Sequence, residues 1–220
     1  MDSDQVIIAI DGLIGAGKTS FIEILKKKFS KEEIFFSFEP VTEFEKFENF
    51  NPLALQSINP FFLQLHIIRC LKTHFKNLLK KAKCAKIIVT ERSFDSPLIF
   101  IDTSYCNGSI SLMEKMMLEK ILQETKEEIG LGEPSGIFFL SCSPEKCYQR
   151  VLLRNRISEL KIVNLEYLTV LKKSYERYFS QKYKNMLRYA SYDINQPEKL
   201  VSDFIEFVND IKKHNNNGEK

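Results

Sequence analysis

The sequence predicts an α/β fold in which a five-stranded parallel sheet carries helices on both faces. Short apolar runs alternate with longer segments of helical periodicity along the whole chain, which is the pattern of parallel strands joined by crossover helices. Polar and charged residues also gather where several of the apolar runs end. Because ligands of such sheets bind beyond the carboxyl ends of the strands, we expect these residues to meet in one cleft.

A glycine-rich loop joins the first predicted strand to the first predicted helix. Residues 6–10 are apolar and mostly β-branched, as in a short strand that is buried on both faces. The pattern Gly12-x-x-x-x-Gly17-Lys18-Thr19 follows, and it is a phosphate-binding pattern in the strand-to-helix context that it requires. The residues expected to bind the phosphates are Gly12, Gly15, Ala16, Gly17, Lys18, Thr19 and Ser20.

Each residue type in this loop has a physical reason. Backbone N–H groups must approach the phosphates closely, which favours glycine, and the helix N-terminus adds unpaired donors and a partial positive charge. Lys18 offers a cation for the β- and γ-phosphates, and Thr19 offers a hydroxyl for Mg²⁺. The alternative, a glycine-rich turn that binds nothing, leaves the Lys-Thr pair at the helix start without a reason.

The next predicted elements lead to two further polar strand ends. A strand over 34–38 ends in Glu39-Pro40, and the proline favours an extended Glu39. An aromatic segment and a loop follow, before a long amphipathic helix over 61–83. A third strand over 87–89 ends in Glu91-Arg92-Ser93, and residues 105–109 are expected to form a polar turn. The aromatic residues of the segment after Glu39 are Phe44, Phe47 and Phe50, and the loop is expected over 51–60.

Capping residues predict where most of the helices in the second half of the chain begin. A capping box, Ser111-x-x-Glu114, begins a helix that runs to about residue 129, and a strand is predicted over 137–140. Ser143-Pro144 begins a helix that leads into three arginines, and a break is expected over 157–163. Asn164 caps a long helix through about residue 184. The last predicted elements are a strand over 187–194, a helix from Pro197 and a frayed polar tail over 212–220.

The composition narrows the class of protein. With 220 residues, 44% hydrophobic and 28% charged, the chain fits one α/β domain, expected over 1–211 with a lid over about 150–163. A net charge of +3 does not favour nonspecific nucleic-acid binding, and no apolar stretch is long enough to span a membrane. The five cysteines are scattered and the first strand follows the N-terminus directly, so we expect reduced thiols, no signal peptide and a cytoplasmic location.

The polar strand ends suit phosphoryl transfer, which depends on positioning and charge neutralisation. Glu39 is placed to take the proton of an acceptor hydroxyl, and Glu91 beside Arg92 offers a metal-side carboxylate and a cation. Arg150 and Arg154 share one helical face, where like charges repel by about 0.2–0.5 kcal/mol, a cost that an anion between them would remove. The alternatives are an exposed strand-end glutamate, a solvated Glu-Arg pair and a solvated basic helix face.

Four motifs taken together resemble the deoxynucleoside kinases of the deoxycytidine, deoxyguanosine and mitochondrial thymidine kinase type. They are the loop over 11–20, Phe38-Glu39-Pro40-Val41, Glu91-Arg92-Ser93 and Arg150-x-x-x-Arg154-x-Arg156. Gln64 after an aromatic helix start, Ser143-Pro144-Glu145 and Leu165-Glu166-Tyr167-Leu168 also match. The resemblance implies ATP and Mg²⁺ as cofactors, a deoxynucleoside as substrate and a homodimer.

The resemblance also implies a role for each matched residue. Glu39 would be the base acting on the 5′-hydroxyl, Arg92 would hold the same end of the nucleoside, and Glu91 would lie on the Mg²⁺ side. Gln64 would pair with the edge of the nucleobase, and Glu159 would bind the sugar 3′-hydroxyl. The three arginines, Arg150, Arg154 and Arg156, would form a lid over the phosphates of ATP.

Several positions depart from the family pattern and bear on the substrate. Phe44 stands where a Trp is usual, no Tyr lies in 51–60 to assist at the sugar, and Ser158-Glu159 replaces an acidic pair. Relatives that accept purines and cytidine have an Arg and an Asp where this chain has Leu71 and Pro97, so the resemblance implies pyrimidines, with thymidine preferred. A shifted alignment would instead place Arg69 in the pocket.

Two other functions compete with this interpretation. A nucleoside-monophosphate kinase, such as a thymidylate kinase, shares the fold and the loop, but its acceptor phosphate needs nearby cations where this chain has Phe38. A non-catalytic nucleotide-binding module is the third reading. Intact Lys18, Thr19, Glu39 and Arg92 favour an enzyme over such a module.

Overall fold

A computed structural model describes residues 5–30, 32–45, 59–160, 162–182, 187–191 and 197–217 of the chain. Phe47, Phe50 and the part of the expected loop over 51–58 lie outside these ranges. The short helix expected after Glu39 is present as α2, Val41–Glu45, and it contains Phe44.

The described strands form one parallel sheet of five strands in the order β2-β3-β1-β4-β5, as predicted. The central strand β1 is buried along its whole length because it pairs with β3 on one side and β4 on the other. The strand bounds are β1 Val6–Gly12, β2 Ile34–Ser37, β3 Ile87–Glu91, β4 Gly136–Ser141 and β5 Leu187–Ser191.

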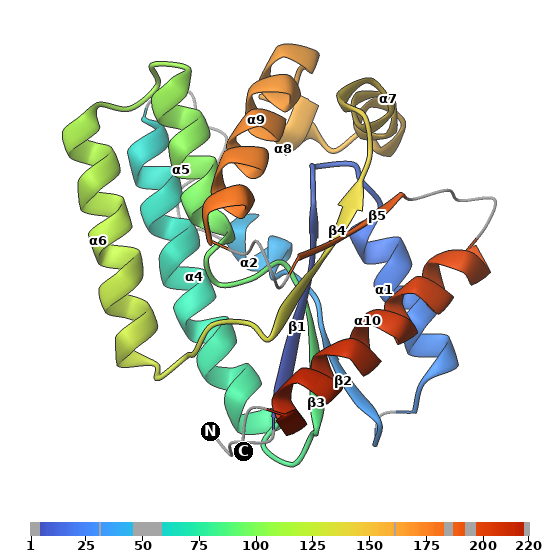
Figure 1. Ribbon diagram of the computed structural model, residues 1–220. Coiled ribbons are helices and arrows are strands. Elements are labelled where there is room, and N and C mark those ends of the chain that lie inside the picture. The colour runs from blue at the N-terminus through green and yellow to red at the C-terminus, as the bar shows by residue number, and fades with distance from the viewer. Residues whose placement is uncertain are drawn as a thin grey trace.

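Helices cover both faces of this sheet (Figure 1). On one face, Ile7 and Ile88 share a core with apolar residues of α4 and α6. On the other face, Phe21 of α1 stacks on Phe138 of β4 with ring centroids 5.6 Å apart, and Phe204 of α10 meets both rings edge-on. The other described helices are α1 Lys18–Lys28, α4 Pro60–Lys81, α5 Ser96–Cys106, α6 Leu112–Glu128, α7 Pro144–Arg154, α8 Ile157–Leu160, α9 Leu165–Lys182 and α10 Pro197–Asn217.

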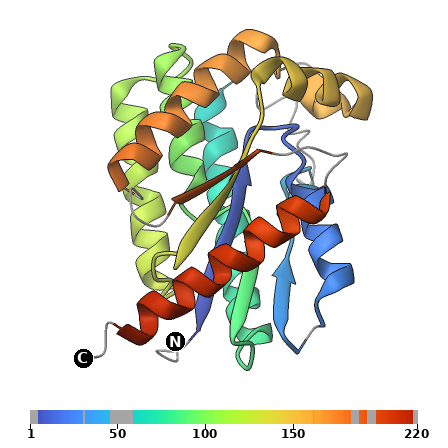
Figure 2. The same cartoon turned by 45° about the vertical axis from the view of Figure 1, so that its right-hand side comes forward.

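Three helix starts confirm the caps that were read from the sequence. The Ser111 and Glu114 side chains exchange hydrogen bonds with each other's backbone N–H groups, as a capping box requires. The Ser143 hydroxyl accepts from the N–H of Lys146 at 3.3 Å, and the Asn164 side chain accepts from the N–H of Tyr167 at 2.7 Å. The Asn164 cap fixes the start of α9 above the carboxyl ends of the strands, where α7, α8 and α9 gather (Figures 1 and 2).

The structure differs from the sequence-based prediction in three segments. Helix α5 was not predicted; it lacks a clear polar face because α4, α6 and α9 all contact it. The polar turn therefore begins after Cys106, and the expected break after Arg156 contains the short helix α8. Helix α10 continues to Asn217, so much of the tail expected to be frayed is helical. Phe207 and Ile211 anchor this helix by packing on Gly136.

None of the described helices is both long enough and apolar enough to cross a membrane.

The capping box gives a direct test of how α6 is held. Ser111→Ala removes the side-chain acceptor for the N–H of Glu114, so we expect a loss of about 1 kcal/mol in the free energy of unfolding. That loss corresponds to a fall in Tm of roughly 2–4 °C for a domain of this size, measured by thermal denaturation. Ser202→Ala, at an exposed position inside α10, is the control and is expected to keep Tm or to raise it slightly, because alanine favours a helix interior. Equal Tm values for both variants would show that the box does not stabilise the fold.

Candidate active site

One large cavity lies over the carboxyl ends of β1, β2 and β3, with a volume of about 1260 Å³. Its walls come from the phosphate-binding loop, α4, α5 and the segment from α7 to α9. The structure brings together most of the site residues predicted from the sequence in this cavity: Gly15, Gly17, Lys18, Thr19, Ser20, Glu39, Phe44, Gln64, Leu71, Glu91, Arg92, Pro97, Arg150, Arg154, Arg156 and Glu159. Gly12 and Ala16 lie beneath the loop surface and do not line the cavity.

The glycines of the loop are required by close backbone packing. Gly15 has φ +82°, and a Cβ there would lie 2.4 Å from the carbonyl oxygen of Cys147 in α7. A Cβ at Gly12 would lie 2.8 Å from the carbonyl oxygen of Leu140 at the end of β4. The loop therefore rests directly on two other backbone segments and leaves its upper surface free for a ligand.

Lys18 closes the loop from below. Its Nζ donates to the carbonyl oxygens of Gly12 at 3.1 Å and Leu13 at 2.9 Å, and the side chain is buried. Burial, with a further contribution from the nearby Arg92 charge, lowers the pKa of Lys18 to about 8. The carboxylates of Glu39, Glu91 and Asp11 offset this effect only in part, and an anion bound in the loop would add negative charge beside the cation.

Arg92 is buried and donates hydrogen bonds to several other residues of the site. Its Nη1 donates to Asp11 Oδ1 at 2.9 Å and to the carbonyl oxygen of Gly12 at 3.2 Å, and it also contacts the hydroxyl of Tyr175. Its Nε donates to Glu39 Oε2 at 3.2 Å. The residue has φ +66°, an uncommon conformation for a side chain of this size, and its N–H bonds to Ile10 at the end of β1. The guanidinium thus ties β1, β2, β3 and α9 together.

Glu39 presents a carboxylate to the cavity beside Arg92. Burial raises the pKa of Glu39, while the charges of Arg92 and Lys18 act in the opposite direction. A partly desolvated carboxylate with a raised pKa is a better proton acceptor than one in free solution. The position of Glu39 at the end of β2 therefore suits the role of a general base.

A hydroxyl and a carboxylate are hydrogen-bonded to each other in the part of the cavity where Mg²⁺ was expected. The Thr19 hydroxyl donates to Glu91 Oε1 at 2.6 Å, and the N–H of Glu39 donates to Glu91 Oε2 at 3.4 Å. Oxygen donors of this kind suit Mg²⁺, which keeps several waters and takes the rest of its ligands from substrate phosphates. No group of three or more His, Cys, Asp or Glu side chains that could hold a metal ion occurs within the described residues.

The three lid arginines divide into two groups. Arg150 donates to the carbonyl oxygens of Gly15 at 3.4 Å and Ala16 at 3.2 Å, so it is docked on the loop. Arg154 and Arg156 both pair with Glu159, at 3.2 Å for Arg156. Glu159 was expected to bind a sugar hydroxyl, and in this structure its carboxylate is held by these arginines instead.

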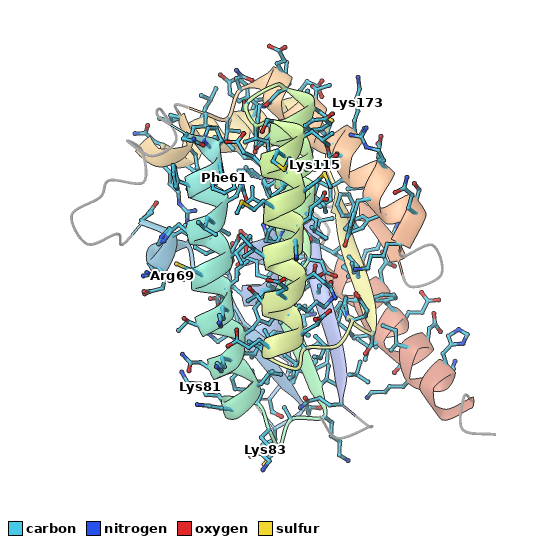
Figure 3. All side chains as sticks on the ribbon, turned by 90° about the vertical axis from the view of Figure 1, so that its left-hand side faces the viewer. Phe61, Arg69, Lys81, Lys83, Lys115 and Lys173 are labelled. Carbon is cyan, nitrogen blue, oxygen red and sulfur yellow. The ribbon has the colours of Figure 1, made fainter. Side chains whose placement is uncertain are left out.

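Helices α4 and α5 form the wall of the cavity that was expected to bind the base. Gln64 is only 6% exposed, and its Oε1 is buried without a hydrogen-bond partner among the described residues. Leu71 and Pro97 line the same cavity. Arg69 is exposed and is not part of the lining; Figure 3 shows it along α4 between Phe61 and Lys81 at the two ends of the helix. The shifted alignment that would place Arg69 in the pocket is therefore wrong.

Some residues of the site were missed by the sequence analysis. Asp11 accepts from Arg92, from the Tyr175 hydroxyl at 2.8 Å, from Ser96 Oγ at 2.6 Å and from the N–H of Gly12 at 2.8 Å. An acidic residue at the end of a buried strand is a signal that a cation lies nearby. Tyr175 and Ser96 carry no such signal, because only the packing of α5 and α9 brings them to Asp11.

Tyr167 and Phe100 also line the cavity without having been predicted to do so. Burial raises the pKa of Tyr167 to about 12, so its hydroxyl stays protonated at neutral pH. The ring of Phe100 lies under the Arg92 guanidinium, 4.9 Å from its centroid. The segment over 165–168 had matched a family motif, but nothing in the sequence showed that its tyrosine faces the site.

Comparisons with known proteins identify the family of the chain. A family model described as deoxynucleoside kinase matches residues 8–216. Human mitochondrial thymidine kinase 2 is 25% identical over 177 residues, covering 78% of this chain and 63% of that protein, so the chain spans less than two thirds of this relative. A putative deoxynucleoside kinase of Frog virus 3 is 26% identical over 216 residues, covering 97% and 98% of the two chains.

Two further relatives carry other substrate names. Deoxyadenosine kinase of Dictyostelium discoideum is 28% identical over 218 residues, covering 93% of this chain and 82% of that protein. A solved structure of deoxyadenosine kinase from M. mycoides, with dCMP and dCDP bound, has a TM-score of 0.70 and 21% identity, and covers 91% of this chain and 99% of its own. This last likeness shows the fold.

The lowered pKa of Lys18 predicts how phosphate binding depends on pH. We expect the affinity for tripolyphosphate to fall as the pH rises through about 8, because the Lys18 cation is then lost. Calorimetric titration between pH 6.5 and 9.5 measures this dependence. In Lys18→Arg the charge persists, so the fall is expected to move to higher pH even if binding is weaker. The same midpoint in both proteins would assign the titration to another group.

Proposed function

The chain belongs to the deoxynucleoside kinase family, and on that premise we propose that it transfers the γ-phosphate of ATP to the 5′-hydroxyl of a deoxynucleoside in nucleotide salvage. The observation that carries the proposal is the arrangement around Arg92. This guanidinium contacts Glu39 on one side and the start of the phosphate-binding loop on the other, at 3.2 Å in each case. An acceptor hydroxyl and a donor phosphate would therefore meet above one fixed cation.

We propose that Glu39 acts as the base. As the 5′-oxygen attacks the γ-phosphorus, its proton passes to the Glu39 carboxylate, and the bond from the γ-phosphorus to the β,γ-bridging oxygen breaks to release ADP. Arg92 holds Glu39 in place through its Nε and leaves the carboxylate facing the cavity. The hydrogen bonds that this cation donates to Asp11 and to the Tyr175 hydroxyl keep it from turning toward solvent.

The donor phosphates would lie in the loop, on the backbone N–H groups of residues 15–20 and next to Lys18. Mg²⁺, held by Thr19 and Glu91, would neutralise charge on the β- and γ-phosphates. Arg154 and Arg156 now share Glu159, and phosphate oxygens would compete with that carboxylate for them. Glu159 would then be released for the sugar 3′-hydroxyl, so that donor binding would prepare the acceptor site.

For the substrate, we propose a pyrimidine deoxynucleoside with thymidine preferred. The Gln64 side chain is buried, its oxygen has no hydrogen-bond partner among the described residues, and its amide can donate and accept at once on one base edge. Phe44 lines the same cavity. Leu71 and Pro97 form an apolar wall that suits a 5-methyl group. Such a methyl contributes about 1–3 kcal/mol, so the preference over deoxycytidine is modest.

A homodimer and a cytoplasmic location complete the proposal. Four apolar side chains on α6 are more than half exposed and lie on one of the two helices that face the viewer in Figure 3. Such a patch is a common interaction surface. These side chains are Leu112, Met113, Met116 and Met117. The five cysteines are free, as is usual in a reducing compartment.

A nucleoside-monophosphate kinase is the competing function. Its acceptor carries a phosphate that needs cations beside Glu39. Phe38 occupies the neighbouring part of the cavity wall, with the Lys26 ammonium 5.2 Å from its ring centroid. Because Arg92 is already engaged with Glu39 and Asp11, the structure favours an uncharged acceptor.

An assay with radiolabelled ATP tests the function and the substrate together. With Mg²⁺ present, we expect transfer to deoxynucleosides, with kcat/KM highest for thymidine, somewhat lower for deoxycytidine and lowest for the purine nucleosides. Thymidine monophosphate belongs in the same series and is expected to be inert. A higher kcat/KM for deoxyguanosine than for thymidine would contradict the assigned base pocket, and preferred use of thymidine monophosphate would establish the competing function.

The role of Glu39 is tested by Glu39→Gln. The amide can still orient a hydroxyl but cannot take its proton, so we expect thymidine binding to be kept while kcat falls by roughly 10²–10⁴. Binding is measured by calorimetry and turnover by the same transfer assay. Glu43→Gln, at an exposed carboxylate on α2, is the control and should retain full activity. Full activity in Glu39→Gln would make Glu39 structural only.

A further inference from the structure

The cavity continues beyond the apolar wall to a polar pair that the proposed reaction does not use. His74 lines the cavity on the same helix as Gln64 and Leu71, and its Nε2 lies 2.9 Å from Ser37 Oγ at the end of β2. Ser37 is buried, with 7% of its surface exposed. The pair is therefore a fixed polar group at the edge of an otherwise apolar region.

The helix geometry places His74 next to Leu71 and farther from Gln64. Residues three apart lie on one face of a helix, and three residues correspond to a rise of about 4.5 Å. Gln64 and His74 are separated by about 15 Å along the helix axis, which is longer than a pyrimidine ring. A base that is held by Gln64 and contacts Leu71 at its 5-position would therefore direct any larger 5-substituent toward His74.

The imidazole has one ring nitrogen left for a ligand. Nε2 is engaged by Ser37, whereas Nδ1 has no hydrogen bond within the part of the chain that the structure describes. Burial lowers the pKa of His74, so the ring is neutral at physiological pH and its free nitrogen can pair with a hydroxyl. Phe75, the next residue of α4, meets this ring edge-on and restricts its rotation.

We propose that His74, held by Ser37, reads a hydrogen-bonding substituent on C5 of a pyrimidine, so that the site accepts 5-hydroxymethyl deoxyuridine as well as thymidine. This inference rests on the proposed function. It assigns His74 as a residue that determines specificity and takes no part in the transfer of the phosphate. In this placement a methyl group would face Leu71 and Pro97, whereas a hydroxymethyl group would add an oxygen on the side of the cavity that His74 lines.

The test compares kcat/KM for 5-hydroxymethyl deoxyuridine and for thymidine in the same assay. In the unmodified protein we expect the two values to be similar. His74→Phe keeps the ring size but removes both nitrogens, and we expect the ratio of the two values to fall roughly ten-fold through the hydroxymethyl substrate alone. His74→Asn, which keeps a donor and an acceptor, is expected to restore part of the ratio.

Ser37→Ala is the second variant, and it decides the matter if His74→Phe does not fold. It removes the hydrogen bond that holds the imidazole but keeps the imidazole itself. We therefore expect the ratio of the two kcat/KM values to fall by a smaller factor, with thymidine turnover unchanged. An unchanged ratio in every folded variant, or a fall that is equal for both substrates, would overturn the role of His74. If neither pyrimidine nucleoside is phosphorylated by the unmodified protein, the proposed function fails and this inference fails with it. Good thymidine turnover with no use of the hydroxymethyl substrate overturns this inference alone.

Discussion

The site depends on one buried cation and its compensation. The Arg92 guanidinium is removed from water, and a buried charge of this kind is tolerated only when charges and hydrogen bonds replace its hydration. Asp11 at the end of β1, Glu39 at the end of β2 and Tyr175 of α9 supply them, so three elements are held to β3 by one side chain. Removing one partner of such a buried pair typically costs about 3–5 kcal/mol. Stability and the position of the candidate base are therefore set by the same interaction.

Charge balance also accounts for the contacts at the two ends of the proposed donor site, which are the phosphate-binding loop and the lid. Lys18 donates to backbone carbonyls and remains partly desolvated, so the loop holds more positive charge than its surroundings compensate. At the lid, Glu159 pairs with Arg154 and Arg156 and offsets the repulsion between like charges. A triphosphate would satisfy both ends at once. The two ends differ in rigidity, since Lys18 is buried in the loop and Arg156 is 41% exposed.

The acceptor side of the cavity is mostly apolar, and its few polar groups carry the selectivity. Gln64 is buried and its oxygen has no hydrogen-bond partner within the described ranges, and a ligand that bonds to it would remove the usual cost of an unpaired buried group. Leu71 and Pro97 provide shape without hydrogen bonds. The His74–Ser37 pair lies farther along α4 and adds a second polar contact. Recognition of a base in such a site depends on the spacing of Gln64, Leu71 and His74 along α4 and on the residues of α5 and β2 that face them.

The sequence by itself determined the fold class, the phosphate-binding loop and the caps of three helices. These features are local: a short β-branched run, glycines before Lys18, or Ser111 three residues before Glu114 act within one turn of chain. It also indicated that Glu39 and Arg92 lie at strand ends, because parallel strands present their carboxyl ends at one edge.

Only the tertiary structure decided the contacts between distant segments. Helix α5 has no periodic signal because neighbours cover it on several sides, and the meeting of Tyr175 with Asp11 links residues 164 positions apart. The pairing of Glu159 with the lid arginines and the exclusion of Arg69 from the cavity likewise depend on side-chain packing. Periodicity reports which face of an element is buried; it does not report which side chain lies across from it.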